Sequence, residues 1–400
     1  MKLSEFLKAN AFRVRVSLLM CLFVACLWAG RNGGGGDFRV LRESVTHAWQ
    51  GEFSKVYDKE ASGPFFYPPA ALVVFGPFSI PNSWSLAVLM NLIFHSVAFW
   101  GMWWGLKEGF PNLFSNGHPL LAWWVVWLFS LAPVHLDFMG QNINLPLCAA
   151  LIGIELLRQK NSKTGYWAAG FLSAIVGWTK IFPAFVTVFY FLLGPKELRL
   201  GTILGFIVGL ISPWLFFGSG GIDLYSYFYQ TLTIYHEKNL IFCNSTLNLP
   251  GWIAVWGRPW FSQSILSLLI ALVPAIVMVI FLALMMQDPL KKEKSIEFSY
   301  WTLAVSLMAF LNSSSRPDYF MFYLPGFCCV ISQWKESRRL EKCCLLGAFL
   351  FISLTQQAMV GRDLNIRLQD ARIPVVGIAL LIVAQVMSLV RQRTRLVLPH

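Results

Sequence analysis

Asp37 is the residue of this 400-residue chain whose surroundings best suit acid–base chemistry. It follows the glycine run 33–36 and precedes apolar residues at helical spacing. At the start of a helix, backbone N–H groups and the helix dipole favour a charged carboxylate, and glycines let a ligand approach the backbone closely. Such a carboxylate can either cap the helix or accept a proton from a hydroxyl group. Asp58 is the second carboxylate considered for this role, with a simple turn residue as the alternative.

Three amides form the next candidate group. Gln141, Asn142 and Asn144 lie close together at the edge of an apolar run, and His135 and Asp137 precede them. Amides in this position can hydrogen-bond the hydroxyls of a sugar, or they can join neighbouring helices. The pattern predicts either a polar pocket, to which His135 and Asp137 would also contribute, or a helix contact.

Lys180 is the most notable cation, because it lies between two apolar runs. An ammonium group there is costly unless it is paired or has a function, and the alternative is that its long side chain reaches the membrane surface. Arg258, Arg316 and His236 lie in loops and are weaker candidates. Tyr67 either stacks on a sugar or belongs to the aromatic belt at a membrane surface.

The composition places these residues in a membrane protein. The chain is 56% hydrophobic and only 13% charged, whereas soluble domains carry about 25% charged residues. The net charge of +12 does not indicate nucleic-acid binding, because most Lys and Arg residues form short clusters between apolar runs, as the positive-inside rule requires. The eight cysteines lie almost all in or beside apolar runs, and the sequence contains no CxxC metal-binding pair.

The apolar runs predict an all-α polytopic protein of about twelve transmembrane helices, with both termini in the cytoplasm. The first run is interpreted as an uncleaved span, because the bulky Trp28 makes a poor signal-cleavage site. All 400 residues form a single membrane domain with two long outer loops, 31–81 and 218–261. The expected runs are 14–30, 82–106, 119–133, 143–157, 165–179, 181–194, 200–217, 262–286, 297–311, 319–333, 343–360 and 373–390.

The first outer loop must position Asp37. A helix that starts there has one apolar face, which predicts an amphipathic helix along the outer membrane surface. Segment 65–80 is apolar but interrupted by prolines. A full span there would put the later Lys and Arg clusters outside, so a re-entrant or interfacial half-helix is expected. The apolar face of the first helix consists of Phe38, Leu41, Val45, Ala48 and Trp49.

Several short motifs occur along the chain in a set order. In these motifs the sequence resembles glycosyltransferase family 87, whose members are polyprenyl-phosphate-sugar-dependent enzymes with the GT-C membrane fold. The resemblance covers most of the chain and implies a GT-C-type helical bundle. The motifs are Asp37-Phe38, Tyr57-Asp58, Tyr67-Pro68-Pro69-Ala70, Gly140-Gln141-Asn142-Ile143-Asn144-Leu145, Lys180-Ile181-Phe182-Pro183 and Asn244-Ser245-Thr246-Leu247.

The resemblance implies inverting transfer of a mannose-like or pentose sugar from polyprenyl phosphate to a hydroxyl of a glycolipid or glycan at the outer membrane face. Asp37 matches the catalytic aspartate of the family and would be the general base. Neither a nucleotide nor another cofactor is implied, and a metal requirement is left open. Donor-phosphate binding is assigned to Lys180, Arg258 and Arg316, and sugar or acceptor binding to Tyr67, Gln141, Asn142, Asn144 and Asn244.

One departure from the family concerns a late outer loop, where Asp318 occupies roughly the position of a family histidine. This puts donor-phosphate binding by that loop, and mannose as the donor sugar, in question. The alternative function is a membrane transporter or flippase for a lipid-linked or small polar substrate. Polar groups gathered at one face, with few charges inside the spans, favour the enzyme. The expected location is the bacterial inner membrane, with the active site on the outer face.

Overall fold

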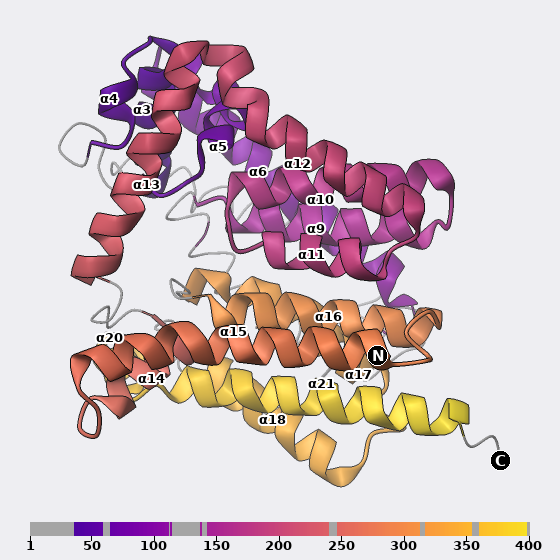
Figure 1. The fold of residues 1–400 in the computed structure, drawn as a ribbon. Helices are drawn as coiled ribbons and strands as arrows, with labels where there is room; N and C mark the ends of the chain where they lie inside the picture. Colours follow the sequence, from indigo (N-terminus) through magenta and orange to yellow (C-terminus); the bar gives the residue numbers. More distant parts are fainter. Residues whose placement is uncertain are drawn as a thin grey trace, which may run out of the picture.

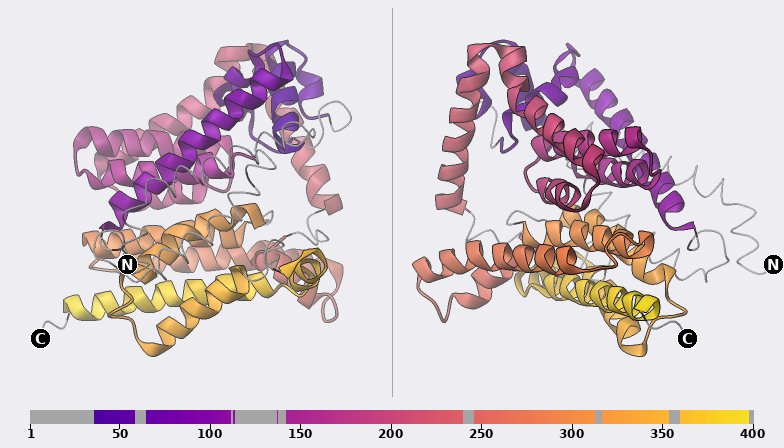
Figure 2. Two further views of the ribbon diagram at one scale, coloured as in Figure 1. Left: turned by 180° about the vertical axis from the view of Figure 1, so that it is seen from behind. Right: turned by 45° about the vertical axis from the view of Figure 1, so that its right-hand side comes forward.

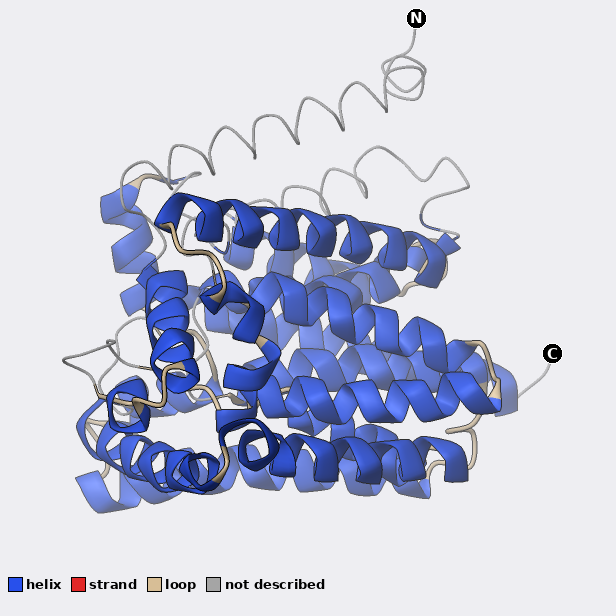
Figure 3. Cartoon of the chain, turned by 90° about the horizontal axis from the view of Figure 1, so that it is seen from above, coloured by secondary structure: helices blue, strands red, loops and turns tan. Residues whose placement is uncertain are grey.

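The computed structural model describes residues 36–58, 65–111, 113, 137, 142–239, 246–312, 317–353 and 360–397. Every element of secondary structure in these ranges is a helix (Figure 3). The expected runs 14–30 and 119–133 lie outside the described residues. The prediction of an all-α protein is confirmed for the part that is described.

The helices form two layers, which stay separate in Figures 1 and 2. The upper layer of Figure 1 contains the earlier helices and the lower layer the later ones. Earlier elements are α3 (Gly36–Trp49), α4 (Phe53–Val56), α5 (Pro69–Val74), η1 (Gly76–Ser79), α6 (Trp84–Gly109), α9 (Asn144–Gln159), α10 (Lys163–Thr179), α11 (Ala184–Leu193), α12 (Lys196–Phe217) and α13 (Ser219–Asn239). Later elements are α14 (Leu249–Gly257), α15 (Gln263–Gln287), α16 (Lys294–Leu311), η2 (Pro317–Tyr323), α17 (Leu324–Ser332), α18 (Arg339–Ser353), α20 (Arg362–Asp370) and α21 (Ile373–Val397).

Four of the described helices, α6, α12, α15 and α21, are long and apolar enough to cross a membrane. Helix α15 shows this most clearly, because only 17% of its most apolar window is buried inside the protein. An apolar face of that size left uncovered fits contact with lipid rather than water. The remaining expected runs correspond to shorter or more polar helices, such as α9 and α10. The number of twelve spans therefore stays a prediction.

The first outer loop differs in detail from the sequence prediction. Helix α3 is amphipathic as expected, but its apolar face packs against protein, with Phe38 against Phe78 and Trp84 at ring-centroid distances of 5.4 and 5.7 Å. Asp37 lies in the first turn of α3, whose described residues start at Gly36, and its role as a helix cap stays a prediction. Segment 65–80 forms the two short helices α5 and η1 instead of one half-helix. Its re-entrant position in a membrane stays a prediction.

The second long loop, 218–261, is largely helical, which the sequence analysis did not predict. It contains α13 and α14, and α13 packs against α4 and α5. The sequence of α13 mixes aromatic and polar residues without a clear apolar face, which explains why hydrophobic periodicity missed it. The consequence is that α13 covers part of the loop that carries Asp37.

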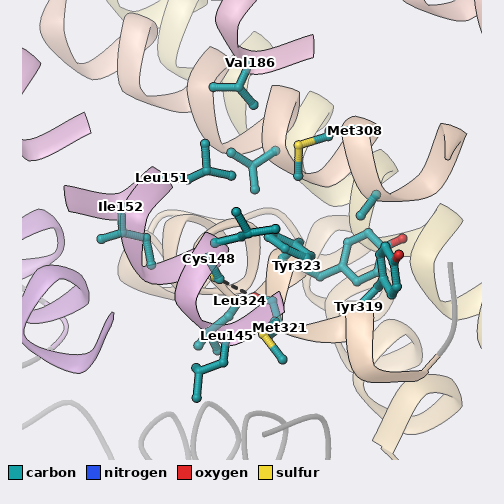
Figure 4. Close-up of a cluster of buried hydrophobic side chains, with 14 of the residues drawn as sticks. Leu145, Cys148, Leu151, Ile152, Val186, Met308, Tyr319, Met321, Tyr323 and Leu324 are labelled. Carbon is teal, nitrogen blue, oxygen red and sulfur yellow. Dashed lines mark hydrogen bonds between the residues drawn. The ribbon is translucent and has the colours of Figure 1, made fainter. Parts of the chain in front are cut away.

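A buried core joins α9 to the later helices and supports the segment that carries the polar residues (Figure 4). Leu145, Cys148 and Leu151 of α9 pack with residues of η2 and α16, and the Cys148 thiol donates a hydrogen bond to the Met321 carbonyl at 3.5 Å. Asn144 is the first residue of α9 and is fully buried beside this core. The polar start of α9 is therefore held in place by the packing of the next two turns.

Buried ion pairs join α9 to α16 and α18 to α21. Arg158, in the last turn of α9, pairs with Glu155 at 2.7 Å and with Glu297 in the first turn of α16. Arg391 of α21 pairs with Glu341 of α18 at 3.0 Å. Helix α9 has 16 residues and is about 24 Å long at 1.5 Å per residue. Arg158, one of the basic residues predicted to face the cytoplasm, therefore lies nearly a helix length away from Asn144.

Candidate functional site

Asp37 is brought to the amide group predicted from the sequence. The Asn142 amide Nδ2 donates a hydrogen bond to the Asp37 carboxylate Oδ2 at 2.8 Å. Asp37 is partly exposed, whereas Asn142 is only 3% exposed. The two residues are 105 positions apart in the chain. A carboxylate has about four lone-pair sites, so it can accept hydrogen bonds besides the one from Asn142.

The orientation of the Asn142 amide is determined by its neighbours. Its side-chain oxygen accepts a hydrogen bond from the Ile143 backbone N–H at 2.7 Å and from the Tyr67 hydroxyl at 3.4 Å. Since the Ile143 backbone N–H can only donate and the Asp37 carboxylate accepts, the amide oxygen must face Ile143 and the amide nitrogen must face Asp37. Tyr67 is itself held by its backbone carbonyl, which accepts a hydrogen bond from the Tyr57 hydroxyl at 2.9 Å.

Lys180 makes a second contact with the segment at the start of α9. Its ammonium Nζ donates a hydrogen bond to the Asn144 side-chain oxygen at 2.7 Å. Three aromatic rings surround the ammonium, with centroids at 4.6 Å for Tyr319, 5.4 Å for Phe182 and 5.5 Å for Tyr67. Cation–π contacts hold an ammonium in a partly buried place without neutralising its charge. Lys180 is therefore a fixed, partly exposed positive charge.

Tyr67 contacts both halves of this site. Its hydroxyl reaches Asn142, and its ring lies against the Lys180 ammonium. Asn142 and Asn144 are two residues apart at the start of α9, so the base candidate and the cation candidate are attached to one short piece of backbone. The sequence motifs that contain Asp37, Tyr67, the two asparagines and Lys180 thus meet in space.

Asp137 contacts the start of α9, the same segment that carries Asn142 and Asn144. It is completely buried, and its Oδ2 accepts a hydrogen bond from the Leu145 backbone N–H at 3.0 Å. The same oxygen lies 3.5 Å from Nε2 of His95, a residue of α6 that is 1% exposed. Sequence analysis did not select His95. The signal was present, because Asn91 and His95 are polar residues four positions apart inside an apolar run, and such residues are expensive in a membrane.

Two predicted residues lie at exposed positions. Asp58 is exposed at the end of the turn after α4. Arg258 is exposed at the end of α14, a helix that packs against α15 and α16 in the lower layer of Figure 1.

The remaining predicted residues cannot be placed from the described ranges. Gln141, Asn244, Arg316 and His135 lie outside them. His236 and Asp318 belong to the backbone of α13 and η2. Their proposed roles rest on the sequence alone.

The fold and the cluster together indicate a class of membrane protein. A helical protein with membrane-spanning helices keeps a carboxylate, amides, a tyrosine and a lysine at one end of its helices. These groups suit acid–base chemistry on hydroxyls and the binding of a negatively charged group. Among the described residues, no group of three or more His, Cys, Asp or Glu side chains is arranged to hold a metal ion.

The family model of glycosyltransferase family 87 matches residues 65–314, more than half of the chain. The protein therefore belongs to glycosyltransferase family 87 and is a glycosyltransferase. No curated protein and no solved structure matches it. The matched range contains Asn142, Asn144 and Lys180. Asp37 and Asp58 precede this range, so the contact between Asp37 and Asn142 is what ties Asp37 to the family region.

Proposed function

We propose that the protein is an inverting glycosyltransferase that moves a sugar from a polyprenyl-phosphate donor to a hydroxyl of a glycolipid or glycan. The proposed site contains Asp37 as general base and Lys180 as the partner of the donor phosphate. The observation that carries the proposal is the attachment of these two residues to Asn142 and Asn144. Membership of a glycosyltransferase family favours this enzyme over the alternative of a transporter or flippase.

An inverting transfer needs opposite charges on the two sides of the reacting carbon. The acceptor hydroxyl gives its proton to Asp37, and its oxygen attacks the anomeric carbon of the sugar. The bond between that carbon and the phosphate oxygen breaks, and polyprenyl phosphate leaves with the bonding electrons. A carboxylate supports the first event and a fixed ammonium group the last. Asp37 and Lys180 supply one of each, and both are partly exposed.

The sugar is assigned to the surface between these two groups. Tyr67 lies there with its ring against Lys180 and its hydroxyl against Asn142. Asn142 is almost fully occupied by protein hydrogen bonds, so its role is to orient Asp37, whereas the exposed parts of Tyr67 are available to a sugar. We propose the outer face of a bacterial inner membrane for this reaction, because Arg158, one of the basic residues predicted to face the cytoplasm, lies at the other end of α9 from Asn144.

The test is transfer of label from a panel of radiolabelled polyprenyl-phosphate sugars to a host lipid extract. The purified protein should transfer label from one donor of the panel. Asp37→Asn should lower the rate by about 10²–10⁴-fold, the usual contribution of a general base. The change is nearly isosteric, so the variant should keep the thermal unfolding temperature of the original protein.

Asp58→Asn is the matched control, because it removes a carboxylate from the same loop at an exposed position. It should leave the rate unchanged. Equal transfer by the original protein and by Asp37→Asn would contradict the role of Asp37, and a loss confined to Asp58→Asn would assign the base to Asp58. Absence of transfer from every donor, together with lipid translocation in vesicles, would support the transporter alternative.

A further inference from the structure

His95 is a buried polar residue to which the proposed reaction gives no role. It belongs to α6, one of the helices long and apolar enough to span a membrane, and it is 1% exposed. In such surroundings a polar ring must find its partners inside the protein. The contacts that His95 makes therefore indicate why a histidine is present there.

Both ring nitrogens of His95 face oxygen atoms that accept hydrogen bonds. Its Nδ1 lies 2.9 Å from the Asn91 carbonyl oxygen. Its Nε2 contacts the Asn142 carbonyl oxygen and lies 3.5 Å from the Asp137 carboxylate. A neutral imidazole donates from only one nitrogen, whereas the imidazolium form donates from both. The charged ring fits this place, and the buried Asp137 carboxylate balances its charge.

Both polar groups of the Asn142 backbone are hydrogen-bonded to this pair of residues. Its carbonyl oxygen accepts from His95, and its backbone N–H donates to the Asp137 carbonyl oxygen at 3.1 Å. The same residue directs its side-chain amide to Asp37 at 2.8 Å. The position of the base therefore depends, through Asn142, on groups in α6 and at residue 137.

We propose that His95 and Asp137 form a buried ion pair that positions Asn142, and through Asn142 the general base Asp37. This inference rests on the proposed function. His95 and Asp137 are positioning residues. They contact Asn142, and because both are buried a substrate cannot reach them. Their loss should lower kcat and leave the KM for the donor unchanged, because a misplaced base affects the reaction more than binding.

Two amide replacements of His95 separate its two nitrogens. In Gln the amide nitrogen lies close to the place of Nε2, which contacts Asn142, and in Asn it lies close to the place of Nδ1, which contacts Asn91. His95→Asn should lower kcat by about 10²-fold, the cost of a small misplacement of a reacting group. His95→Gln should keep kcat within about tenfold of the original value. Both variants should keep the KM for the donor.

The measurement uses the full chain with the donor that supports transfer by the original protein. Because each replacement leaves the Asp137 carboxylate unbalanced, each is also combined with Asp137→Asn, which removes that charge. Thermal unfolding confirms that the compared variants are folded. His47→Gln is the control, since His47 lies on the same helix as Asp37 but pairs with Glu52 at 2.6 Å, away from Asn142. It should leave kcat unchanged.

Equal kcat values for folded His95→Gln and His95→Asn would overturn the inference, because a position-specific contact cannot be matched equally by both amides. A rise in the KM for the donor at unchanged kcat would also overturn it. If the original protein transfers label and Asp37→Asn does not, either result leaves the proposed function intact. If the original protein transfers no label from any donor, the proposed function fails, and the positioning role with it.

Discussion

At the residue scale, Lys180 combines a hydrogen bond to Asn144 with contacts to three aromatic rings. If its charge binds the donor phosphate, Lys180→Gln should lower kcat/KM for the donor by about 10- to 100-fold. This is the loss expected when a hydrogen bond to a charged group, worth about 1.5–3 kcal/mol, is removed. Lys180→Arg keeps the positive charge and should lose less. Steady-state kinetics over a range of donor concentrations measure both effects.

Lys163 provides the matched control for Lys180. It is an exposed lysine at the first position of α10, whereas Lys180 directly follows the last residue of that helix. Lys163→Gln should leave kcat/KM unchanged. A similar loss for both lysines would mean that the effect comes from the net charge of the protein, and the specific role of Lys180 would then be wrong.

Residue types predicted the polar members of the site better than they predicted its geometry. Asp37, Asn142, Asn144 and Lys180 stand out in sequence, because each is polar beside an apolar run. His95 is also polar inside an apolar run, but its partner Asn142 is 47 positions away, and local spacing carries no information about that contact. The packing of the apolar helices determines which polar groups meet, and the periodicity of a single sequence does not reveal that packing.

At the element scale, the position of Lys180 depends on the close packing of α10 against α12. A Cβ at Gly201 of α12 would lie 2.1 Å from the Trp167 carbonyl oxygen of α10. Gly201→Ala should therefore force the helices apart and destabilise the protein by about 1–3 kcal/mol, the usual cost of overpacking. A lower thermal unfolding temperature in a fixed detergent would show this effect.

The control for this prediction is Gly153→Ala in α9. A Cβ there would meet no atom within 4 Å, and alanine is favoured over glycine inside a helix by about 1 kcal/mol. This variant should be as stable as the original protein or slightly more stable. If Gly201→Ala behaves in the same way, the two helices tolerate a larger separation and do not pack as closely as the structure indicates.

Long apolar helices were predictable, and short helices in the outer loops were not. Helices α6, α12, α15 and α21 follow the expected apolar runs within a few residues, except that α21 continues past its run to Val397. Helices α13 and α14 lie where a loop was expected. Their stability comes from packing against other parts of the protein, such as α13 against α4 and α5, rather than from a regular apolar pattern.

At the scale of the whole molecule, the two layers are joined by a buried ionic cluster. Arg158 of α9 bridges Glu155 of its own helix and Glu297 of α16, and the Tyr190 hydroxyl of α11 donates to Glu155 at 3.0 Å. Arg158 and Glu155 have side chains only 5% and 1% exposed. A buried ion pair contributes little by itself, but the loss of one partner leaves a buried charge without compensation.

Arg158→Leu should therefore destabilise the protein by about 3–5 kcal/mol. Replacing Arg158, Glu155 and Glu297 together by leucine should restore much of this loss, because no unbalanced charge then remains. Thermal unfolding of the three proteins in the same detergent measures the difference. Arg39→Ala is the control, since its pair with Glu43 is solvent-exposed and should contribute less than about 1 kcal/mol. An Arg158→Leu protein as stable as Arg39→Ala would mean that water reaches Glu155 and Glu297, and the two layers would then be held together by apolar packing alone.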